Sequence, residues 1–376
     1  MRVIKLDSFI STVQWTIRSW KEGYPLTNDV DQWVWTANGE DLPAWAKDVE
    51  GTWARWKFLS PFFASHGIYI YELDSPYGKT PARPPLYPKP QHFASEVWPW
   101  PRRAYKEERE LDFDHIQVVR VWAARDANGR ELVLRLASGH VPTDELKAFQ
   151  RLNTAKARSD SRNHTLPILK YLTFDGLVFA VMPRWAPVAF SARARASKVA
   201  ELVHLAEVFY EGMEFLHENR IAHRDHYPGN AVLNALTDDG KGLGLRVPGE
   251  VRYAYIDFGA ALVLPMETDI DTVLVDREMR IGSIGLGLKP GVCNPFKDDV
   301  LLLTRMIQST VRVIENVVPE IGAFFDNILQ GDYASCPSAT EALIRFRKLQ
   351  SNLSQGQLDM PPSGIFWRNG RVQRDD

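Results

Sequence analysis

The chain has 376 residues, of which 45% are hydrophobic and 24% are charged, and these are the proportions of a globular protein rather than of a disordered or fibrous one. The formal net charge of -2 gives no sign of the basic face that binds nucleic acid. No run approaches the ~20 apolar residues of a membrane helix, and two cysteines are too few for a disulfide framework. We therefore expect an intracellular protein, cytoplasmic or nuclear, with no nucleic-acid or membrane partner.

Residues 1–75 are a tryptophan-rich N-terminal region. Nine of the twelve tryptophans lie among the first hundred residues. Tryptophan is most often a buried packing unit, so we expect these side chains to be buried, with a ligand-binding aromatic surface as the alternative. The nine are Trp15, Trp20, Trp33, Trp35, Trp45, Trp53, Trp56, Trp98 and Trp100.

Residues 76–110 are predicted to be a proline-rich linker. Eight prolines lie between Pro76 and Pro101. Proline cannot donate the hydrogen bonds of a sheet and favours extended backbone. We therefore expect this segment to be a linker or a strap that lies on the surface of the protein.

Residues 111–184 are predicted to form a small β-rich unit with one helix. Two β-prone runs flank an Asn-Gly pair, which is a strong hairpin signal in this setting. A helical stretch at 145–152 follows, and two further apolar runs come after it. The expected strands are 116–125, 131–136, 166–172 and 177–182.

Residues 185–350 are predicted to be mainly helical. Between residues 197 and 217 the apolar side chains recur at intervals of three to five, which indicates an amphipathic helix against a core. Further helices are expected at 298–314 and 339–349, and residues 351–376 form a C-terminal tail. The expected fold class is therefore α+β.

Two short motifs carry the chemistry of the chain. Residues 223–230 read HRDHYPGN, which fits the pattern H-R-D-x-x-x-x-N, and residues 257–259 read DFG. Each motif has the expected neighbours, because an apolar strand at 231–233 follows the first and a strand at 253–256 precedes the second. Order, spacing and context together make a chance match a poor explanation.

On these motifs the chain resembles the eukaryotic protein kinase family, and more narrowly the divergent kinase-like proteins of mushroom-forming fungi. The likeness covers roughly residues 110–350. It implies a bilobal protein-kinase-like fold with a small β-rich lobe at 111–184, a larger α-helical lobe at 185–350 and ATP between them. The narrower likeness rests on RNH (162–164), PIL (167–169), VMP (181–183), YIDFG (255–259) and NPFKDDV (294–300).

Phosphoryl transfer gathers negative charge on the moving group, so its site needs metal-binding oxygens and a carboxylate beside the attacking hydroxyl. Asp225 is expected to be that carboxylate and to act as the catalytic base. Asn230 and Asp257 supply hard oxygen ligands of the kind that hold Mg²⁺. The expected cofactors are therefore ATP and Mg²⁺.

The resemblance also implies which side chains bind the nucleotide. Arg135 stands where the family has a lysine that pairs with the ATP phosphates, and Glu145 is its expected ion-pair partner, with Glu131 as the alternative. Contacts with the nucleotide are further expected from Val133 and from Met182 and Arg184 of the hinge between the lobes.

Two other residues of the motifs have structural roles in the resemblance. Arg224 is expected to contact a phosphorylated or acidic activation segment, with an ordinary salt bridge as the alternative. Asp299 resembles an aspartate that braces the catalytic loop through hydrogen bonds. Its alternative is a simple favourable charge near a helix N-terminus.

The chain departs from the family pattern at the nucleotide clamp and at the substrate platform. The guanidinium of Arg135 is larger and flatter than an ammonium. Residues 116–125 contain no glycine, which hinders close approach of the backbone to phosphate. Tyr227 replaces the lysine that is usual two residues after the catalytic aspartate. No A-P-E triplet is visible near Cys293, and Cys336 stands where its arginine partner is expected.

The favoured interpretation is an ATP- and Mg²⁺-dependent protein kinase that transfers the γ-phosphate to a protein hydroxyl, with serine or threonine as the preferred acceptor. The first alternative is a pseudokinase scaffold, with weak or absent transfer. A small-molecule phosphotransferase is the second alternative, against which Arg224 and the complete DFG triplet argue. The expected partner is a protein, either as substrate or as binding partner.

Overall fold

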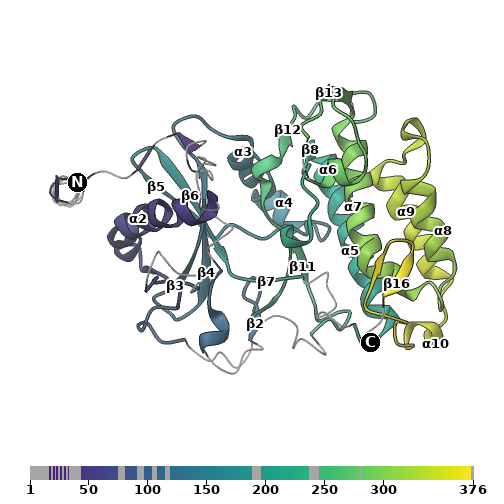
Figure 1. The fold of residues 1–376 in the computed structure, drawn as a ribbon, viewed down its shortest axis with the longest axis horizontal. Coiled ribbons are helices and arrows are strands. Elements are labelled where there is room, and N and C mark those ends of the chain that lie inside the picture. The colour runs from purple at the N-terminus through teal and green to yellow at the C-terminus, as the bar shows by residue number, and fades with distance from the viewer. Residues whose placement is uncertain are drawn as a thin grey trace.

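A computed structural model shows a mixed α+β protein, with a curled antiparallel sheet toward one end and a group of helices toward the other (Figure 1). Within the described ranges, no helix combines the length and the hydropathy that crossing a membrane requires. The structure describes residues 44–74, 81–90, 97–103, 108–114, 119–188, 196–236, 245–279 and 281–373, together with scattered positions between 17 and 33.

The sheet has five strands in the order β1-β3-β4-β6-β5, and each neighbouring pair is antiparallel. The predicted Asn-Gly hairpin joins β3 to β4. Gly129 has a φ of 76°, a left-handed conformation that glycine adopts without strain. The Asp126 carboxylate accepts hydrogen bonds from the turn amides of Asn128 and Arg130. The strands are β1 (Ile68–Ile70), β3 (Val121–Asp126), β4 (Glu131–Ser138), β5 (Lys170–Phe174) and β6 (Leu177–Pro183).

The edge strand β1 comes from the tryptophan-rich region, although the sequence pattern predicts that the sheet begins near residue 111. Ile68, Tyr69 and Ile70 alternate between buried and exposed positions, but three residues are too few for such an alternation to indicate a strand. The pairing of Ile70 with Ala124 is a long-range contact. The connection from β1 to its neighbour β3 is therefore a segment of fifty residues rather than a tight turn.

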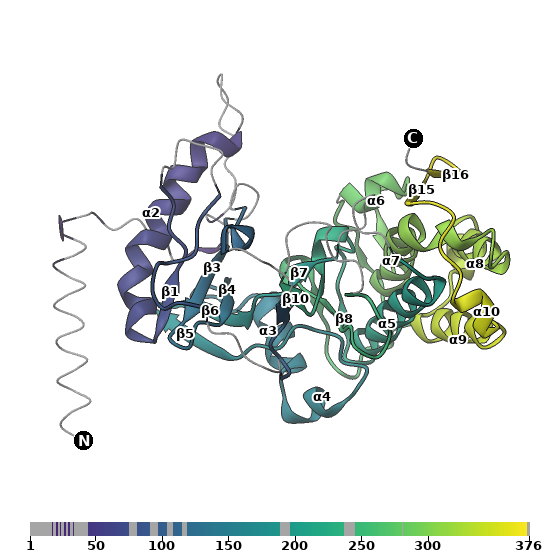
Figure 2. The same ribbon diagram turned by 90° about the horizontal axis from the view of Figure 1, so that it is seen from below.

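Helix α2 (Ala44–Ser65) packs the tryptophan-rich region onto this sheet (Figure 2). Trp56 is fully buried, and its ring stacks on Trp122 with centroids 5.9 Å apart. Its Nε1 atom donates to the Val119 carbonyl at 3.1 Å. Burial is confirmed for Trp33 and Trp56, and Trp53 and Trp100 are partly buried. Trp20 and Trp98 are instead 84% and 44% exposed. Trp15, Trp35 and the Trp45 side chain lie outside the described part of the chain.

The described part of the proline-rich segment is a strap fastened to the sheet. Backbone bridges join Glu72 to Arg83 and Ala82 to Phe113. The buried guanidinium of Arg125 holds the strap through hydrogen bonds to two of its carbonyl groups. These carbonyls belong to Pro85 and Pro88.

A second stretch of the same segment, 97–103, reaches from the sheet to the helical part. The Arg103 guanidinium donates to the Gly129 carbonyl of the β3–β4 turn at 3.2 Å. On the other side, the Trp185 indole donates to the Pro99 carbonyl at 2.9 Å. Strand β2 (Arg102–Arg103) pairs in parallel with β10 (Ala235–Leu236). The segment is thus bonded to both parts of the molecule.

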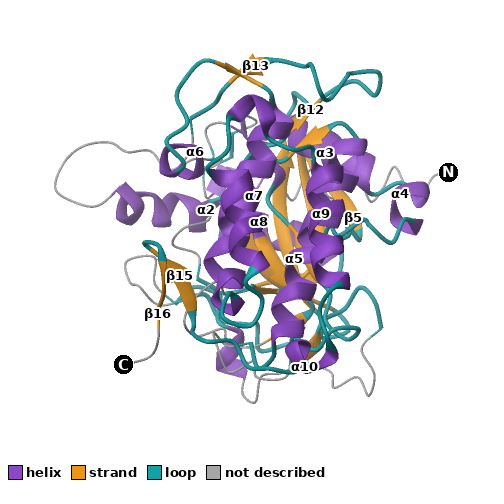
Figure 3. Ribbon diagram, turned by 90° about the vertical axis from the view of Figure 1, so that its right-hand side faces the viewer, coloured by secondary structure: helices purple, strands orange, loops and turns teal. Residues whose placement is uncertain are grey.

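The helical part is built around α5, which packs against α7 and α9 (Figure 3). Helix α7 begins three residues before the predicted start, because Asn294 caps it through its side chain and Pro295 suits a first helical position. Its predicted last turn is a short 3₁₀ helix. The helices are α5 (Val199–Glu218), α6 (Ile281–Gly285), α7 (Pro295–Val311), α8 (Glu320–Leu329), α9 (Ala339–Ser351) and α10 (Gln355–Leu358).

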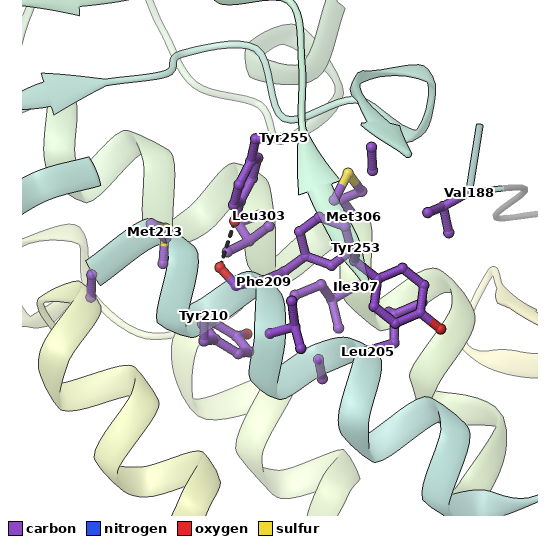
Figure 4. Close-up of a cluster of buried hydrophobic side chains, with 14 of the residues drawn as sticks. Val188, Leu205, Phe209, Tyr210, Met213, Tyr253, Tyr255, Leu303, Met306 and Ile307 are labelled. Carbon is purple, nitrogen blue, oxygen red and sulfur yellow. Dashed lines mark hydrogen bonds between the residues drawn. The ribbon is translucent and has the colours of Figure 1, made fainter. Parts of the chain in front are cut away.

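Buried aromatic and aliphatic side chains join α5 to α7 and to strand β11 (Figure 4). The Tyr255 hydroxyl donates to the Phe209 carbonyl of α5 at 2.5 Å. Gly212 of α5 lies under the same ring, where a β-carbon would come within 2.8 Å of it. This packing holds β11, and the DFG residues that follow it, against the main helix.

The remaining helices and strands are short. Helices α3 (Asp144–Leu152) and α4 (Ala155–Ser159) lie between β4 and β5 in the chain, where the sequence predicts one helix. The remaining strands are β7 (Ala186–Pro187), β8 (Ile221–Ala222), β9 (Ala231–Leu233), β11 (Tyr253–Tyr255), β12 (Leu262–Val263), β13 (Val275–Asp276), β14 (Val292–Cys293), β15 (Phe366–Arg368) and β16 (Arg371–Gln373). The 3₁₀ helices are η2 (Glu108–Leu111), η3 (Pro228–Asn230), η4 (Phe258–Ala260), η5 (Arg312–Ile314) and η6 (Tyr333–Ser335).

Candidate active site

The loop between β8 and β9 contains the HRD motif, and the buried carboxylate of Asp299 fastens it. The backbone amides of His223 and Arg224 donate to the two oxygens of Asp299, each at 2.7 Å. The imidazoles of His217 and His226 lie 3.2 and 3.3 Å from the same carboxylate. Burial opposes ionisation of Asp299, but the neighbouring histidines outweigh it and hold its pKa far below the usual range. The expected bracing of the loop by Asp299 is present.

Asp225 and Asn230 face each other across this loop. The Asn230 amide donates from Nδ2 to the backbone carbonyl of Asp225 at 2.9 Å and to its carboxylate Oδ2 at 3.0 Å. The amide therefore fixes the direction of the carboxylate, and its own Oδ1 points away as an acceptor. Tyr227, at the position where the family pattern has lysine, is 59% exposed.

The DFG residues lie beside this loop because both the amide and the carbonyl of Ile256 make hydrogen bonds to it. The Ile256 amide donates to the Asn230 carbonyl at 3.0 Å, and the His223 Nε2 atom lies 3.0 Å from the Ile256 carbonyl. Both motifs contain a non-glycine residue with positive φ, 62° at Arg224 and 58° at Asp257. Such strained conformations persist where the surrounding structure holds them and are enriched at functional sites.

Arg135 joins the sheet to the DFG motif through a buried ion cluster. Its Nε and Nη2 atoms donate to the two oxygens of Glu145 at 2.8 and 3.2 Å. The same Nη2 donates to Asp257 Oδ1 at 2.8 Å. The expected Arg135–Glu145 pair is therefore present, whereas Glu131 pairs with Arg125 at 2.7 Å. A guanidinium fork can serve two carboxylates in this way.

Asp257 is ionised in this setting. Its side chain is 39% exposed, and one oxygen also accepts the Gly259 amide. Burial by itself would raise the pKa of Asp257, but Arg135, the Gly259 amide, His223 and Arg120 together hold the pKa below its ordinary value. The carboxylate thus carries its charge at neutral pH.

Contacts between aromatic rings hold helix α3 against both motifs. Phe258 packs edge-on against Phe149 of α3 with centroids 5.7 Å apart, and it lies 5.0 Å from the His223 ring. Because Glu145 lies on the same helix as Phe149, this packing places the carboxylate opposite Arg135. The sequence shows Phe149 as a member of an apolar helix face, but no local pattern reveals its contact with Phe258.

Val133 and Met182, two predicted nucleotide contacts, lie opposite each other on β4 and β6. They belong to one apolar cluster with Val232, two residues after the first motif, and Ile256, directly before the second. Val133 and Ile256 are only partly buried. Sequence reasoning missed Val232 and Ile256, although both stand close to a motif residue.

Arg184, the third of these predicted nucleotide contacts, turns away from this cluster. Its guanidinium donates to the Tyr71 hydroxyl at 3.0 Å and to the carbonyls of Leu111 and Asp112 at 2.5 and 3.0 Å. Its backbone amide donates to the Glu131 carbonyl at 3.0 Å. The Arg184 side chain therefore contacts Tyr71 and the backbone at 111–112, and not the apolar cluster of Val133 and Met182.

The segment after the DFG motif is held by two ion pairs. Arg224 donates to Glu278 at 3.0 Å, a contact that fits both the acidic partner implied by the resemblance and the ordinary salt bridge that is its alternative. Arg277 makes two hydrogen bonds to Asp298 of α7, at 2.6 and 3.0 Å. Tyr333 also donates to Asp298. The Arg277–Asp298 ion pair stabilises the region near Cys293, where the A-P-E triplet of the family pattern is missing. No sequence motif predicts this ion pair.

The donors of the site fit Mg²⁺ bound together with phosphate. Among the described residues, no group of three or more His, Cys, Asp or Glu side chains could hold a metal by itself. The Asn230 side-chain oxygen and the Asp257 carboxylate are hard oxygen donors, and Asp257 belongs to the ion cluster. Mg²⁺ is commonly held by one or two carboxylates, water and substrate phosphates rather than by a protein cage. Asn230 and Asp257 would therefore hold it only with a phosphate ligand present.

Comparison with models of known protein families found none that matches this chain, and no curated protein matches it significantly.

Proposed function

We propose that this protein is an ATP- and Mg²⁺-dependent protein kinase with a bilobal fold, in which the sheet and α3 form the small lobe. The observation that carries the proposal is the ion cluster of Arg135, Glu145 and Asp257 beside the Asp225–Asn230 pair. In this proposal Arg135 supplies positive charge for the phosphates, and Asp225 supplies the carboxylate that activates the acceptor hydroxyl.

Each group has a chemical role in this proposal. Asp225 orients the acceptor hydroxyl and takes its proton, and Asn230 holds that carboxylate in place. Asn230 and Asp257 hold Mg²⁺, which supplies positive charge to the phosphates when bound. Arg135 contacts the phosphates, with Glu145 fixing its guanidinium. The partly buried apolar surface at Val133 and Ile256 suits the flat face of adenine.

The same cluster also favours a second candidate, a pseudokinase scaffold. Arg135 already donates to two carboxylates, and these bonds compete with phosphate for the guanidinium. A protein of this kind would keep the fold and bind a protein partner, with little or no transfer. Substitutions in the cluster separate the two candidates.

Replacing Asp257 by alanine is expected to weaken ATP binding at least about tenfold when Mg²⁺ is present, because a charged metal ligand is lost. Without Mg²⁺ the variant and the wild type should differ far less. The measurement is a titration with ATP, with and without Mg²⁺, followed by thermal stabilisation. The control is Asp74→Ala, which removes a carboxylate from an exposed ion pair with Arg83. Equal Mg²⁺-dependent stabilisation in wild type and Asp257→Ala would remove Asp257 from the metal site.

Replacing Arg135 by lysine is expected to lower kcat/KM for ATP about tenfold, or ~1.4 kcal/mol. The guanidinium reaches both Glu145 and Asp257, and the compact ammonium of lysine cannot reproduce that geometry. The assay is phosphate incorporation into a generic acceptor protein by both variants. An increase in ATP affinity and turnover would instead support the scaffold, since it would mean that arginine is a lesion in a site no longer used for transfer.

A further inference from the structure

The long connection between β1 and β3 ends at Arg120, the residue directly before β3. The Arg120 backbone lies beside Arg135 of the ion cluster. Val121 pairs with Arg135 in the sheet, and the Arg120 carbonyl accepts a hydrogen bond from the Leu136 amide at 2.8 Å. Arg120 thus lies beside Arg135 at the start of β3. The chain reaches this point through a fifty-residue connection from β1, whereas a short turn usually joins adjacent antiparallel strands.

Gly259 of the DFG motif shows where the Arg120 side chain points. A β-carbon placed on Gly259 would lie 2.7 Å from Arg135 Nη2, 3.0 Å from Asp257 Oδ1 and 3.1 Å from Arg120 Nη2. All three polar atoms therefore converge on one point. The two guanidinium nitrogens lie within about 6 Å of each other, close enough for their like charges to repel unless anions lie between or beside them.

The carboxylates of Glu145 and Asp257 supply two negative charges beside these two guanidinium groups. Arg120 lies close to the Asp257 carboxylate, because Arg120 Nη2 and Asp257 Oδ1 both lie near the same β-carbon position on Gly259. Asp257 is nevertheless partly exposed, so the cluster is open on one side. Two guanidinium forks beside an exposed edge form a geometry that matches phosphate oxygens.

We propose that Arg120 is a second phosphate-binding residue, which holds the polyphosphate of a nucleoside triphosphate together with Arg135. This inference rests on the proposed function. It explains how phosphate can be held although residues 116–125 contain no glycine: side-chain guanidinium groups take the place of backbone amides. Because the contact is made to phosphate alone, Arg120 selects for the charged tail of the nucleotide and not for its base.

The test compares Mg-ATP with adenosine as ligands of the full-length chain. Arg120→Ala is expected to bind Mg-ATP about tenfold more weakly than the wild type, while its affinity for adenosine stays the same. Arg120→Lys keeps one charge but loses the fork, so it should lie between the two. The matched control is Arg83→Ala, which removes an exposed guanidinium paired with Asp74 and should leave both affinities unchanged. Calorimetric titration measures each affinity directly.

The outcomes separate this inference from the proposed function. Binding of Mg-ATP by the wild type, with equal binding by Arg120→Ala, would overturn the role of Arg120 and leave the kinase proposal standing. A parallel loss of Mg-ATP and adenosine binding in Arg120→Ala would also overturn it, because that pattern indicates a structural role. Failure of the wild type to bind Mg-ATP would overturn the proposed function and the inference together.

Discussion

Replacing Asp225 by asparagine is expected to lower phosphate transfer by a factor on the order of 10² to 10⁴, the range that a positioned general base contributes. Affinity for Mg-ATP should stay close to that of the wild type, because Asp225 acts on the acceptor hydroxyl and not on the nucleotide. The amide keeps the size of the side chain, and its oxygen can still accept the hydrogen bond that Asn230 donates at 3.0 Å. The measurement is phosphate incorporation at saturating ATP, with a separate ATP titration.

The control for this variant is Asp74→Asn, since Asp74 lies in an exposed ion pair and such pairs contribute little. Its transfer rate should equal that of the wild type. If Asp225→Asn incorporates phosphate as fast as the wild type, Asp225 is not the base. If neither protein incorporates phosphate although both bind Mg-ATP, the scaffold becomes the better interpretation.

Replacing Trp56 by alanine is expected to lower the free energy of unfolding by about 3–5 kcal/mol, the usual cost of truncating a fully buried large aromatic side chain. The Trp56 ring packs against Trp33, Phe63, Trp122 and Phe179, so its loss leaves a cavity between α2 and the sheet. Its hydrogen bond to the Val119 carbonyl would also be lost. Urea unfolding monitored by circular dichroism measures the change.

Two further variants calibrate the result. Trp56→Phe keeps part of the buried ring and should lose less stability than Trp56→Ala. Trp20→Ala removes an 84% exposed side chain and should change the free energy of unfolding by less than about 0.5 kcal/mol. A small effect of Trp56→Ala, comparable to that of Trp20→Ala, would mean that the N-terminal region does not support the sheet.

The Asn-Gly hairpin, the long helix at 199–218 and the HRD and DFG motifs could all be predicted from the sequence, because each depends on residues close together in the chain. Turn chemistry, helical periodicity and motif spacing are local properties. Within the candidate site, the residues that belong to one of the two motifs could be predicted in the same way. The pairing of Arg135 with Glu145 was expected only from the resemblance to protein kinases, and the structure contains it.

The rest could not be predicted, because it depends on contacts between distant segments. Strand β1 becomes part of the sheet only by pairing with β3, and Arg184 turns toward Tyr71. Arg277, directly after strand β13, pairs with Asp298 of helix α7.

Local patterns in the sequence predicted the α+β class, helices α5, α7 and α9, the hairpin and the residues of the two motifs, but not helices α2 and α8. The packing of distant segments brings the tryptophan-rich region into the sheet and makes Arg120 and Arg135 converge on Gly259. The physical reason is that a hairpin or helix stabilises itself through neighbours in the chain. An edge strand or an ion cluster exists only when the fold brings separate segments within the few ångströms over which hydrogen bonds and close charges act.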